Sequence, residues 1–191
     1  MDARFIELVS RARAAVVVKD AAGYCVYANR LSEEMRGLPP GALHGKHITE
    51  LAGADPRLVV QEFERFKRQG AWIGQYPVKG VSGELVNLRS CNFIHHEWDG
   101  ADLYVSFNYR LGSHNNLDRD GPARLIQHPL TAENVCVAQF CADGYTEDEV
   151  SVLLGIHREN VGLLAAGLIA GMKASSWTEA CVRALKSRLV V

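Results

Sequence analysis

Hydrophobic residues follow two different spacings along the chain. Between Ala14 and Leu111, β-branched and aromatic residues gather in short runs that have the composition of strands. The five runs span residues 14–18, 24–28, 72–78, 85–98 and 103–111. From Leu130 onward there is no β-rich run, and apolar residues recur only at helical spacing. The pattern predicts a β-rich first part and an all-α second part.

Capping residues mark the helices of the first part. Asn29 follows the second run and is a good N-cap for a helix over residues 30–36. A longer helix begins after Asp55 and ends at Gly70. Its apolar stripe, at spacings i, i+4 and i+7, consists of Val59, Phe63 and Phe66. The order of elements predicts an α+β fold, a five-stranded antiparallel sheet with helices on one face.

Polar and helix-breaking residues separate the two parts of the chain. Residues 112–129 are rich in Ser, His, Asn, Asp, Gly and Pro, which is typical of a boundary between domains. We predict a first domain over residues 1–111, a linker over 112–129, and a small all-α domain over 130–191. The third of its four expected helices covers residues 157–172.

Composition and charge limit the kinds of function that this chain can have. The 191 residues carry a formal net charge of −1, so there is no general excess of Lys and Arg to attract phosphates. The five cysteines lack CxxC spacing, which indicates reduced thiols in a cytosol and no metal site. The N-terminus has no signal-peptide pattern, and the longest apolar run, residues 161–172, is too short to span a bilayer. We expect a cytoplasmic protein that has no membrane contact.

Two segments carry a resemblance to the PAS family of sensory domains. They are Val-Val-Lys-Asp-Ala-Ala-Gly-Tyr-Cys-Val-Tyr-Ala-Asn at 17–29 and Gly-Lys-His-Ile-Thr-Glu-Leu at 45–51. Together with the element order, they make residues 5–111 similar to a PAS domain; a generic α+β domain is the alternative. The resemblance implies a pocket between the sheet and the crossover helix. It also implies a dimer surface on the lead helix, at Phe5, Ile6 and Val9.

The resemblance leaves the ligand of this pocket unknown. Flavin-adduct PAS domains carry an Asn-Cys-Arg-Phe-Leu-type motif after the second strand, and residues 30–36 contain no Cys. Haem-binding members often place a proximal His on the crossover helix, and residues 55–70 contain none. Flavin and haem are therefore disfavoured, which leaves a small-molecule ligand. Candidate pocket residues, which core packing explains equally well, are Asn29, Phe63, Phe66, Trp72, Asn92, Phe93, His95 and Phe107.

The second domain matches a known pattern at several places along its helices. The matching residues are Leu130-Thr131-Ala132-Glu133, residues 142–150, Leu154-Gly155-Ile156, Val161 and Ala180. By these residues, the domain over 130–191 resembles the LuxR/NarL-type helix-turn-helix. The resemblance implies that the third helix enters the major groove of DNA while basic side chains contact phosphates. It also implies a second dimer surface, at Ala180, Ala184 and Leu185. The two resemblances together imply a bacterial transcription regulator that acts as a homodimer.

The third helix departs from the family where DNA contacts belong. In place of the usual Thr-Val-Lys-x-His, residues 160–164 read Asn-Val-Gly-Leu-Leu. Gly, Ala and Leu side chains cannot hydrogen-bond to base edges. From Leu130 to Val191, five Lys and Arg stand against seven Asp and Glu, a net charge of −2 that weakens attraction to phosphates. The best remaining DNA contacts are His157, Arg158 and Lys173.

The same helix supports an alternative function. Gly162, Ala166 and Ala170 form a seam of small residues at i, i+4 and i+8. Leu163 and Ile169 are expected to be exposed beside this seam, and exposed apolar residues often mark interfaces. The competing interpretation is that Leu163 packs on a neighbouring helix or on the first domain. The alternative is a regulator that binds no DNA and docks another protein, such as a partner transcription factor. The sequence contains no nucleophile–base pair, phosphate loop or carboxylate dyad that would indicate an enzyme.

Overall fold

The computed structural model describes residues 1–80, 83–97, 100–111, 130–187 and 189–190. The chain divides into two compact units, unit 1 (Met1–His114) and unit 2 (Asn115–Val191). The segment 112–129, predicted to be a linker, lies outside the described residues. Unit 1 contains a sheet with helices, and the described part of unit 2 is helical.

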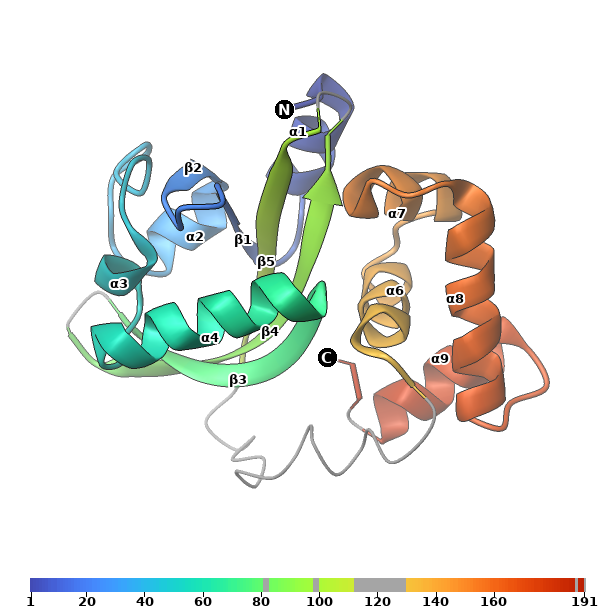
Figure 1. Cartoon of the computed structure of the whole chain (residues 1–191). Helices are drawn as coiled ribbons and strands as arrows, with labels where there is room; N and C mark the ends of the chain where they lie inside the picture. The colour runs from blue at the N-terminus through green and yellow to red at the C-terminus, as the bar shows by residue number, and fades with distance from the viewer. Residues whose placement is uncertain (81–82, 98–99, 112–129, 188, 191) are drawn as a thin grey trace. The chain divides into compact units, whose positions relative to one another are not determined.

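An antiparallel sheet forms the centre of unit 1 (Figure 1). Its strands are β1 (Ala15–Lys19), β2 (Cys25–Ala28), β3 (Ala71–Lys79), β4 (Leu85–His96) and β5 (Asp102–Arg110). They lie in the order β2-β1-β5-β4-β3, so the first strand of the sheet in the sequence pairs with the last. This pairing sets Val17 opposite Ser106. The predicted five-stranded sheet is confirmed.

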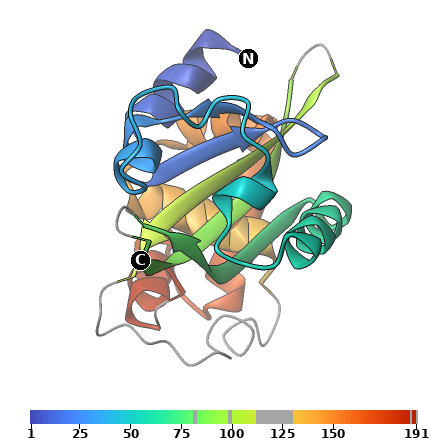
Figure 2. The same ribbon diagram turned by 90° about the vertical axis from the view of Figure 1, so that its left-hand side faces the viewer.

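Helices cover one face of this sheet, and Figure 2 looks onto that face. They are α2 (Arg30–Glu34), α3 (Ile48–Leu51) and α4 (Pro56–Gln69). The predicted ends of α4 are confirmed, because Asp55 caps its first turn and Gly70 follows its last residue with a φ of 79°. Phe63 and Phe66 of α4 are buried, so the predicted apolar stripe lies between the helix and the sheet.

The first helix, α1 (Ala3–Ser10), places its apolar side chains on the opposite face of the sheet. The Phe5 ring stacks on the His95 ring of β4, with centroids 4.2 Å apart. His95 and Asn92 are three residues apart on one strand, so their side chains point to opposite faces. The sheet of unit 1 therefore has helical cover beyond the single layer that the sequence predicts.

Asn29 joins three elements of unit 1. Its Oδ1 accepts hydrogen bonds from the N–H groups of Ser32, in α2, and Val16, in β1. Its Nδ2 donates to the carbonyls of Ala14 and, from α1, Val9. The predicted N-cap of α2 is confirmed. The same side chain also fixes α1 and β1 to the start of α2.

Four helices make up the described part of unit 2. They are α6 (Ala132–Ala142), α7 (Glu147–Leu154), α8 (Arg158–Gly171) and α9 (Trp177–Lys186). Thr131 and Thr146 each form a capping box, which satisfies N–H groups at the starts of α6 and α7. Gly155 ends α7 in the left-handed conformation, with a φ of 64°. A short turn joins α7 to α8 at an angle of 106°, which is helix-turn-helix geometry.

Apolar side chains of α7 and α8 are buried in unit 2. Val150 and Leu153 of α7, like Val161 and Leu168 of α8, are 0% exposed. The two residues of α8 are seven positions apart, which agrees with the helical spacing of apolar residues that the sequence shows beyond Leu130. None of the described helices is by itself long and apolar enough to cross a membrane. The pair α7 and α8 reaches that length and composition only when joined across its 106° bend.

The end of α8 is a Schellman motif whose left-handed residue is a lysine. Lys173 has a φ of 51°; its N–H bonds to the carbonyl of Ala170, and the N–H of Ala174 bonds to that of Ile169, both at 3.0 Å. A Cβ in this conformation costs about 1–2 kcal/mol, which glycine avoids. Glycine also makes the unfolded chain more flexible, which offsets part of this gain. We therefore expect Lys173→Gly to raise the free energy of unfolding of unit 2, measured in urea, by about 0.5–1 kcal/mol.

Lys173→Ala is the matched control for this prediction. It removes the same charge and the same long side chain, but it keeps the Cβ that causes the strain. We expect it to change the free energy of unfolding by less than about 0.5 kcal/mol. Equal stabilisation by both variants would mean that the charge, and not the backbone conformation, is responsible.

Candidate functional site

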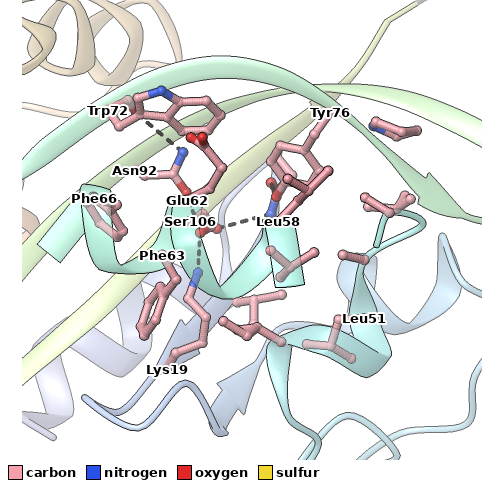
Figure 3. A pocket seen from close by; sticks show the side chains of 18 of the residues that line it. Lys19, Leu51, Leu58, Glu62, Phe63, Phe66, Trp72, Tyr76, Asn92 and Ser106 are labelled. Carbon is pink, nitrogen blue, oxygen red and sulfur yellow. Dashed lines mark hydrogen bonds between the residues drawn. The ribbon is translucent and has the colours of Figure 1, made fainter. Parts of the chain in front are cut away.

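A cavity of about 320 Å³ lies between the sheet and the helices α3 and α4 of unit 1 (Figure 3). Most of its wall is aromatic or aliphatic. The apolar lining residues include Ile48, Leu51, Leu58, Val59, Phe63, Phe66 and Trp72. A mostly apolar concave site of this size, with a few polar groups, is typical of sites for small molecules.

Polar side chains of the sheet form the floor of this cavity. Ser106 donates a hydrogen bond to Oδ1 of Asn92 at 2.5 Å. Tyr76 donates to Oδ1 of Asn108 at 2.5 Å, and the Ser90 hydroxyl lies 3.2 Å and 2.9 Å from the two amide oxygens. Apart from Tyr76, these side chains are 5% exposed or less. Buried polar groups are costly unless they are satisfied, and this network satisfies its members mutually.

Lys19 adds a buried cation to the same floor. It is 8% exposed, its Nζ donates to Oγ of Ser106, and the Phe63 ring centroid is 6.0 Å away. Burial lowers the pKa of Lys19 from 10.5 to about 8, the Cys25 thiol partly opposes this shift, and the positive charge of Arg36 adds to it. With a pKa of about 8, Lys19 remains mostly protonated at neutral pH.

Arg36 is a second cation in the cavity lining. Its Nη1 donates to the carbonyl of Ser32 at 3.0 Å, while its buried Nε has no hydrogen-bond partner among the described residues. Burial lowers the pKa of Arg36, but a guanidinium stays charged at neutral pH. The lining also includes the acid Glu62, which is exposed and pairs with Arg65 at 3.2 Å. Among the described lining residues, the buried Lys19 and the half-buried Arg36 therefore carry positive charge, and the one acid, Glu62, is exposed.

Trp72 forms a flat wall along β3 because the next residue on its face of the strand is a glycine. A Cβ at Gly74 would collide with the indole of Trp72, so any side chain there would displace the ring. The Trp72 ring stacks with that of Tyr76 at a centroid distance of 6.4 Å and an angle of 25°. The carbonyl of Trp72 accepts a hydrogen bond from Asn92 at 3.2 Å. Gly74 thus shapes this side of the cavity.

Only half of the predicted pocket residues line the cavity. Those that do are Phe63, Phe66, Trp72 and Asn92. Phe93 and His95 alternate with Asn92 along β4, and Phe107 is the neighbour of Ser106 on β5, so all three point to the other face of the sheet. There the Phe93 and Phe107 rings lie 5.9 Å apart. The prediction that these three residues face the cavity is wrong.

Asn29 is the fourth predicted pocket residue that lies elsewhere. It is 2% exposed and does not belong to the cavity lining. Its amide makes four hydrogen bonds to backbone groups, which leaves no polar atom of the side chain for a ligand. The sequence shows a cap at this position, and the cap is the role that the side chain performs.

Lys19, Ser106 and Asn108 were not predicted, although the sequence holds a signal for them. The strands β4 and β5 each carry two small polar residues two positions apart, at 90 and 92 and at 106 and 108. Residues at i and i+2 share one face of a strand, so each pair marks a polar face. Lys19 follows a run of three valines and likewise points to that face, beside Val17 in the lining.

No group of three or more His, Cys, Asp or Glu side chains in the described ranges could hold a metal ion. The described lining of the cavity contains neither His nor Cys. The nearby rings of His44 and His47 bond to backbone carbonyls, of Val26 and Ala22 respectively. All five cysteines are free thiols, and three of them, Cys25, Cys91 and Cys136, are buried.

In unit 2, the residues predicted to contact DNA or a partner protein lie on one exposed side of α8 and at its two ends. The exposed residues are His157, Arg158, Gly162, Leu163, Ala166, Ala170 and Lys173. Leu163 is 70% exposed, as its place in the hydrophobic pattern predicts. Asn160 was not among the predicted contact residues. It is exposed on the same helix, and its amide can both donate and accept hydrogen bonds.

Acidic residues surround the start of α8. The guanidinium of Arg158 lies 3.4 Å from the Glu147 carboxylate and 3.3 Å from that of Asp148, both in the first turn of α7. Glu159 follows it directly in α8. Exposed ion pairs of this kind contribute only about 0–1 kcal/mol, so a phosphate can compete for Arg158. The negative surroundings nevertheless weaken the attraction of any phosphate to this end of the helix.

Four of the six predicted dimer residues are buried within the chain. Phe5, Val9, Ala180 and Ala184 are 0% exposed. Phe5 packs on the ring of His95 in its own sheet, and Ala180 and Ala184 are the buried residues of α9 in unit 2. The prediction that these four form a dimer surface is wrong, because the chain itself covers them. Ile6 is partly exposed, and Leu185 is 47% exposed.

Comparisons with known proteins show similarity of fold. No family model and no curated protein matches the chain. Among solved structures, a light-oxygen-voltage domain studied with a flavin analogue is 16% identical, with a TM-score of 0.50 over 59% of this chain and 88% of that one. The VqmA dimer of Vibrio cholerae, described as a LuxR-type receptor, is 18% identical, with a TM-score of 0.49 over 100% of this chain and 91% of that one. The PAS domain of an HTR-like protein from Haloarcula marismortui is 17% identical, with a TM-score of 0.49 over 56% and 89% of the two chains. Unit 1 has the PAS fold.

Proposed function

We propose that the chain regulates transcription, with unit 1 as the sensor of a small molecule and unit 2 as the output module. One observation carries this proposal. A PAS fold that holds a cavity with a polar floor shares its chain with a helix-turn-helix. The first arrangement suits the binding of a small ligand, and the second suits the contact of one helix with a larger partner.

The polar floor supports a ligand-binding role for the cavity. The face of a sheet beneath a helix is normally apolar, since buried polar groups add little stability even when they are paired. Lys19, Asn92 and Ser106 nevertheless lie on that face and are at most 8% exposed. A function that needs these groups explains why they are there. The aromatic rings of Phe63, Phe66 and Trp72 then contact the apolar part of the ligand.

For the output module, we propose that α8 contacts DNA. In this proposal, His157 and Arg158 at its start contact base edges or phosphates, and Lys173 at its end contacts a phosphate. The missing donors along the middle of the helix predict weak binding with little sequence discrimination. We further propose that the acting form is a homodimer. Leu185 and its neighbour Val182, both exposed on α9, are the candidate contacts.

The exposure of Leu163 favours a second candidate function, in which α8 docks another protein. Leu163 is 70% exposed beside the small residues Gly162 and Ala166. A partner helix approaches closely where side chains are small and gains from covering an exposed leucine. The partner in this case is another transcription factor, and the chain regulates it without touching DNA.

Fluorescence anisotropy with labelled duplex DNA tests the two functions. We expect the purified chain to bind weakly at a salt concentration of about 50 mM and to lose about 10- to 40-fold in affinity by about 200 mM, because two or three neutralised phosphates give only a moderate salt dependence. Arg158→Ala should weaken binding at low salt by about tenfold, since it removes a cation of the contact helix.

Lys186→Ala is the matched control, because Lys186 is an exposed cation of unit 2 that lies on α9. It should leave the affinity within about twofold. Equal losses from the two variants would mean that binding depends on overall charge and not on α8. No binding at low salt would contradict the DNA-binding function and leave α8 as a protein-docking surface.

A further inference from the structure

On the floor of the cavity, the amide oxygens of Asn92 and Asn108 already accept hydrogen bonds from neighbouring side chains. Oδ1 of Asn92 accepts from Ser106 and lies within 3.2 Å of the Ser90 hydroxyl. Oδ1 of Asn108 accepts from Tyr76 and lies 2.9 Å from the same hydroxyl. An amide oxygen has two lone pairs, so these oxygens have little capacity left for a ligand donor.

Open donors belong to the two cations and to Gln75, whose buried Nε2 has no hydrogen-bond partner among the described residues and which also lines the cavity. The ammonium group of Lys19 has three N–H donors, and Ser106 is its one hydrogen-bond partner among the described residues. The buried Nε of Arg36 adds a donor that has no partner among the described residues. Both side chains line the cavity. A ligand that satisfies them must supply acceptor atoms.

The charge of the lining points in the same direction. Lys19 and Arg36 are close enough for the charge of one to lower the pKa of the other. Glu62 does not balance them, because it is exposed and pairs with Arg65. Two neighbouring positive charges, one buried and one half-buried, are costly, and an anion that enters the cavity reduces that cost.

We propose that this cavity binds a small planar organic anion, with its carboxylate or equivalent oxyanion held by Lys19 and Arg36. The inference rests on the proposed role of unit 1 as a sensor and names the class of ligand. The planar part lies among the rings of Phe63, Phe66 and Trp72, where Gly74 keeps the indole flat against the strand. A cavity of about 320 Å³ has room for one or two fused rings.

Calorimetric titration of the full chain with 2-naphthoate and 2-naphthamide at neutral pH tests the proposal. The two probes share a ring system and a size, and they differ in the charge of the polar end. We expect naphthoate to bind at least about tenfold more tightly, because a hydrogen bond between two charged groups is stronger than one to a neutral amide. Equal affinities, tighter binding of the amide, or no binding of either probe at about 1 mM would overturn the proposal.

Lys19→Met locates the site within the chain. It should weaken the binding of naphthoate about tenfold and leave that of naphthamide within about twofold. Lys67→Met is the matched control, because Nζ of Lys67 also lies over the Phe63 ring, at 5.3 Å, but Lys67 does not line the cavity. Equal losses of naphthoate affinity in the two variants would assign the effect to general charge and overturn the site.

A further measurement separates this inference from the proposed function. Naphthoate binding is measured without DNA, so it does not depend on the output function of unit 2. Suppose that the chain binds naphthoate as expected, but that its DNA affinity is the same with and without saturating naphthoate. This result would contradict the sensor function and leave the anion site intact. DNA binding by a chain that takes up neither probe overturns the anion site and leaves the output function intact.

Discussion

Replacement of Asn29 by alanine should lower the free energy of unfolding of unit 1 by about 3–5 kcal/mol. Its side chain bonds to the N–H groups of Val16 at 2.9 Å and Ser32 at 3.1 Å, and to the carbonyls of Ala14 at 2.9 Å and Val9 at 3.2 Å. Alanine removes all four hydrogen bonds, although the N–H of Ser32 keeps a bond to the main-chain carbonyl of residue 29 at 3.0 Å. Each buried group left unsatisfied costs about 1–3 kcal/mol, and partial relaxation reduces the sum.

Urea unfolding followed by tryptophan fluorescence measures this loss, in a Trp177→Phe background that removes the tryptophan of unit 2. Asn87→Ala is the control, because Asn87 is an exposed asparagine of β4 in the same unit. It should change the free energy of unfolding by less than about 0.5 kcal/mol. A cost below about 1 kcal/mol for Asn29→Ala would show that water or neighbouring groups replace the four hydrogen bonds.

Lys19→Met should stabilise unit 1 by about 1–3 kcal/mol at pH 7, and this gain should fade as the pH rises. Burial lowers the pKa of Lys19 from 10.5 to about 8. Below pH 8 the folded and unfolded chains both hold the proton, so the full cost of the buried charge is present. Between pH 8 and 10.5 the folded chain releases the proton first. The unfolded chain then binds more protons, and the stability of the unmodified protein rises with pH.

The difference in unfolding free energy between the two chains, measured from about pH 7 to about pH 10, checks this prediction. Burial raises the pKa of Cys25 to about 11 and also raises that of Tyr76, but both groups are present in both chains, so most of their effect cancels. Lys67→Met is the control, since Lys67 bonds to the carbonyl of Ala21 outside the cavity. A difference that stays constant with pH would show that the buried charge is not its cause.

The ends of helices could be predicted from the sequence alone. Thr146 and Gly155 mark the two ends of α7, and Asp55 and Gly70 mark those of α4. A cap depends on the backbone angles and hydrogen bonds of a few neighbouring residues, and those residues are adjacent in the sequence. The five strands could be predicted for a similar reason, because β-branched and aromatic runs suit extended backbone.

The direction of each side chain from the sheet could not be predicted in the same way. Asn92 and Phe93 were both assigned to the pocket, although adjacent residues of a strand point to opposite faces. The strand β4 has buried residues on both of its faces, so its hydrophobic pattern does not show which face lies under α4. The sequence also did not determine which surface the apolar face of α1 packs on. The spacing of Phe5 and Val9 suits packing on a second copy of the chain as well as on the chain's own sheet.

The sequence by itself determined the elements, their order and the depleted chemistry of α8, because these depend on local composition and spacing. Only the tertiary structure decided the cavity. Lys19 and Ser106 are far apart in the sequence and meet because β1 pairs with β5. Gly74 matters only because the Trp72 ring lies over it. Contacts between distant strands follow from the pairing of the whole sheet, and short segments of sequence carry no record of that pairing.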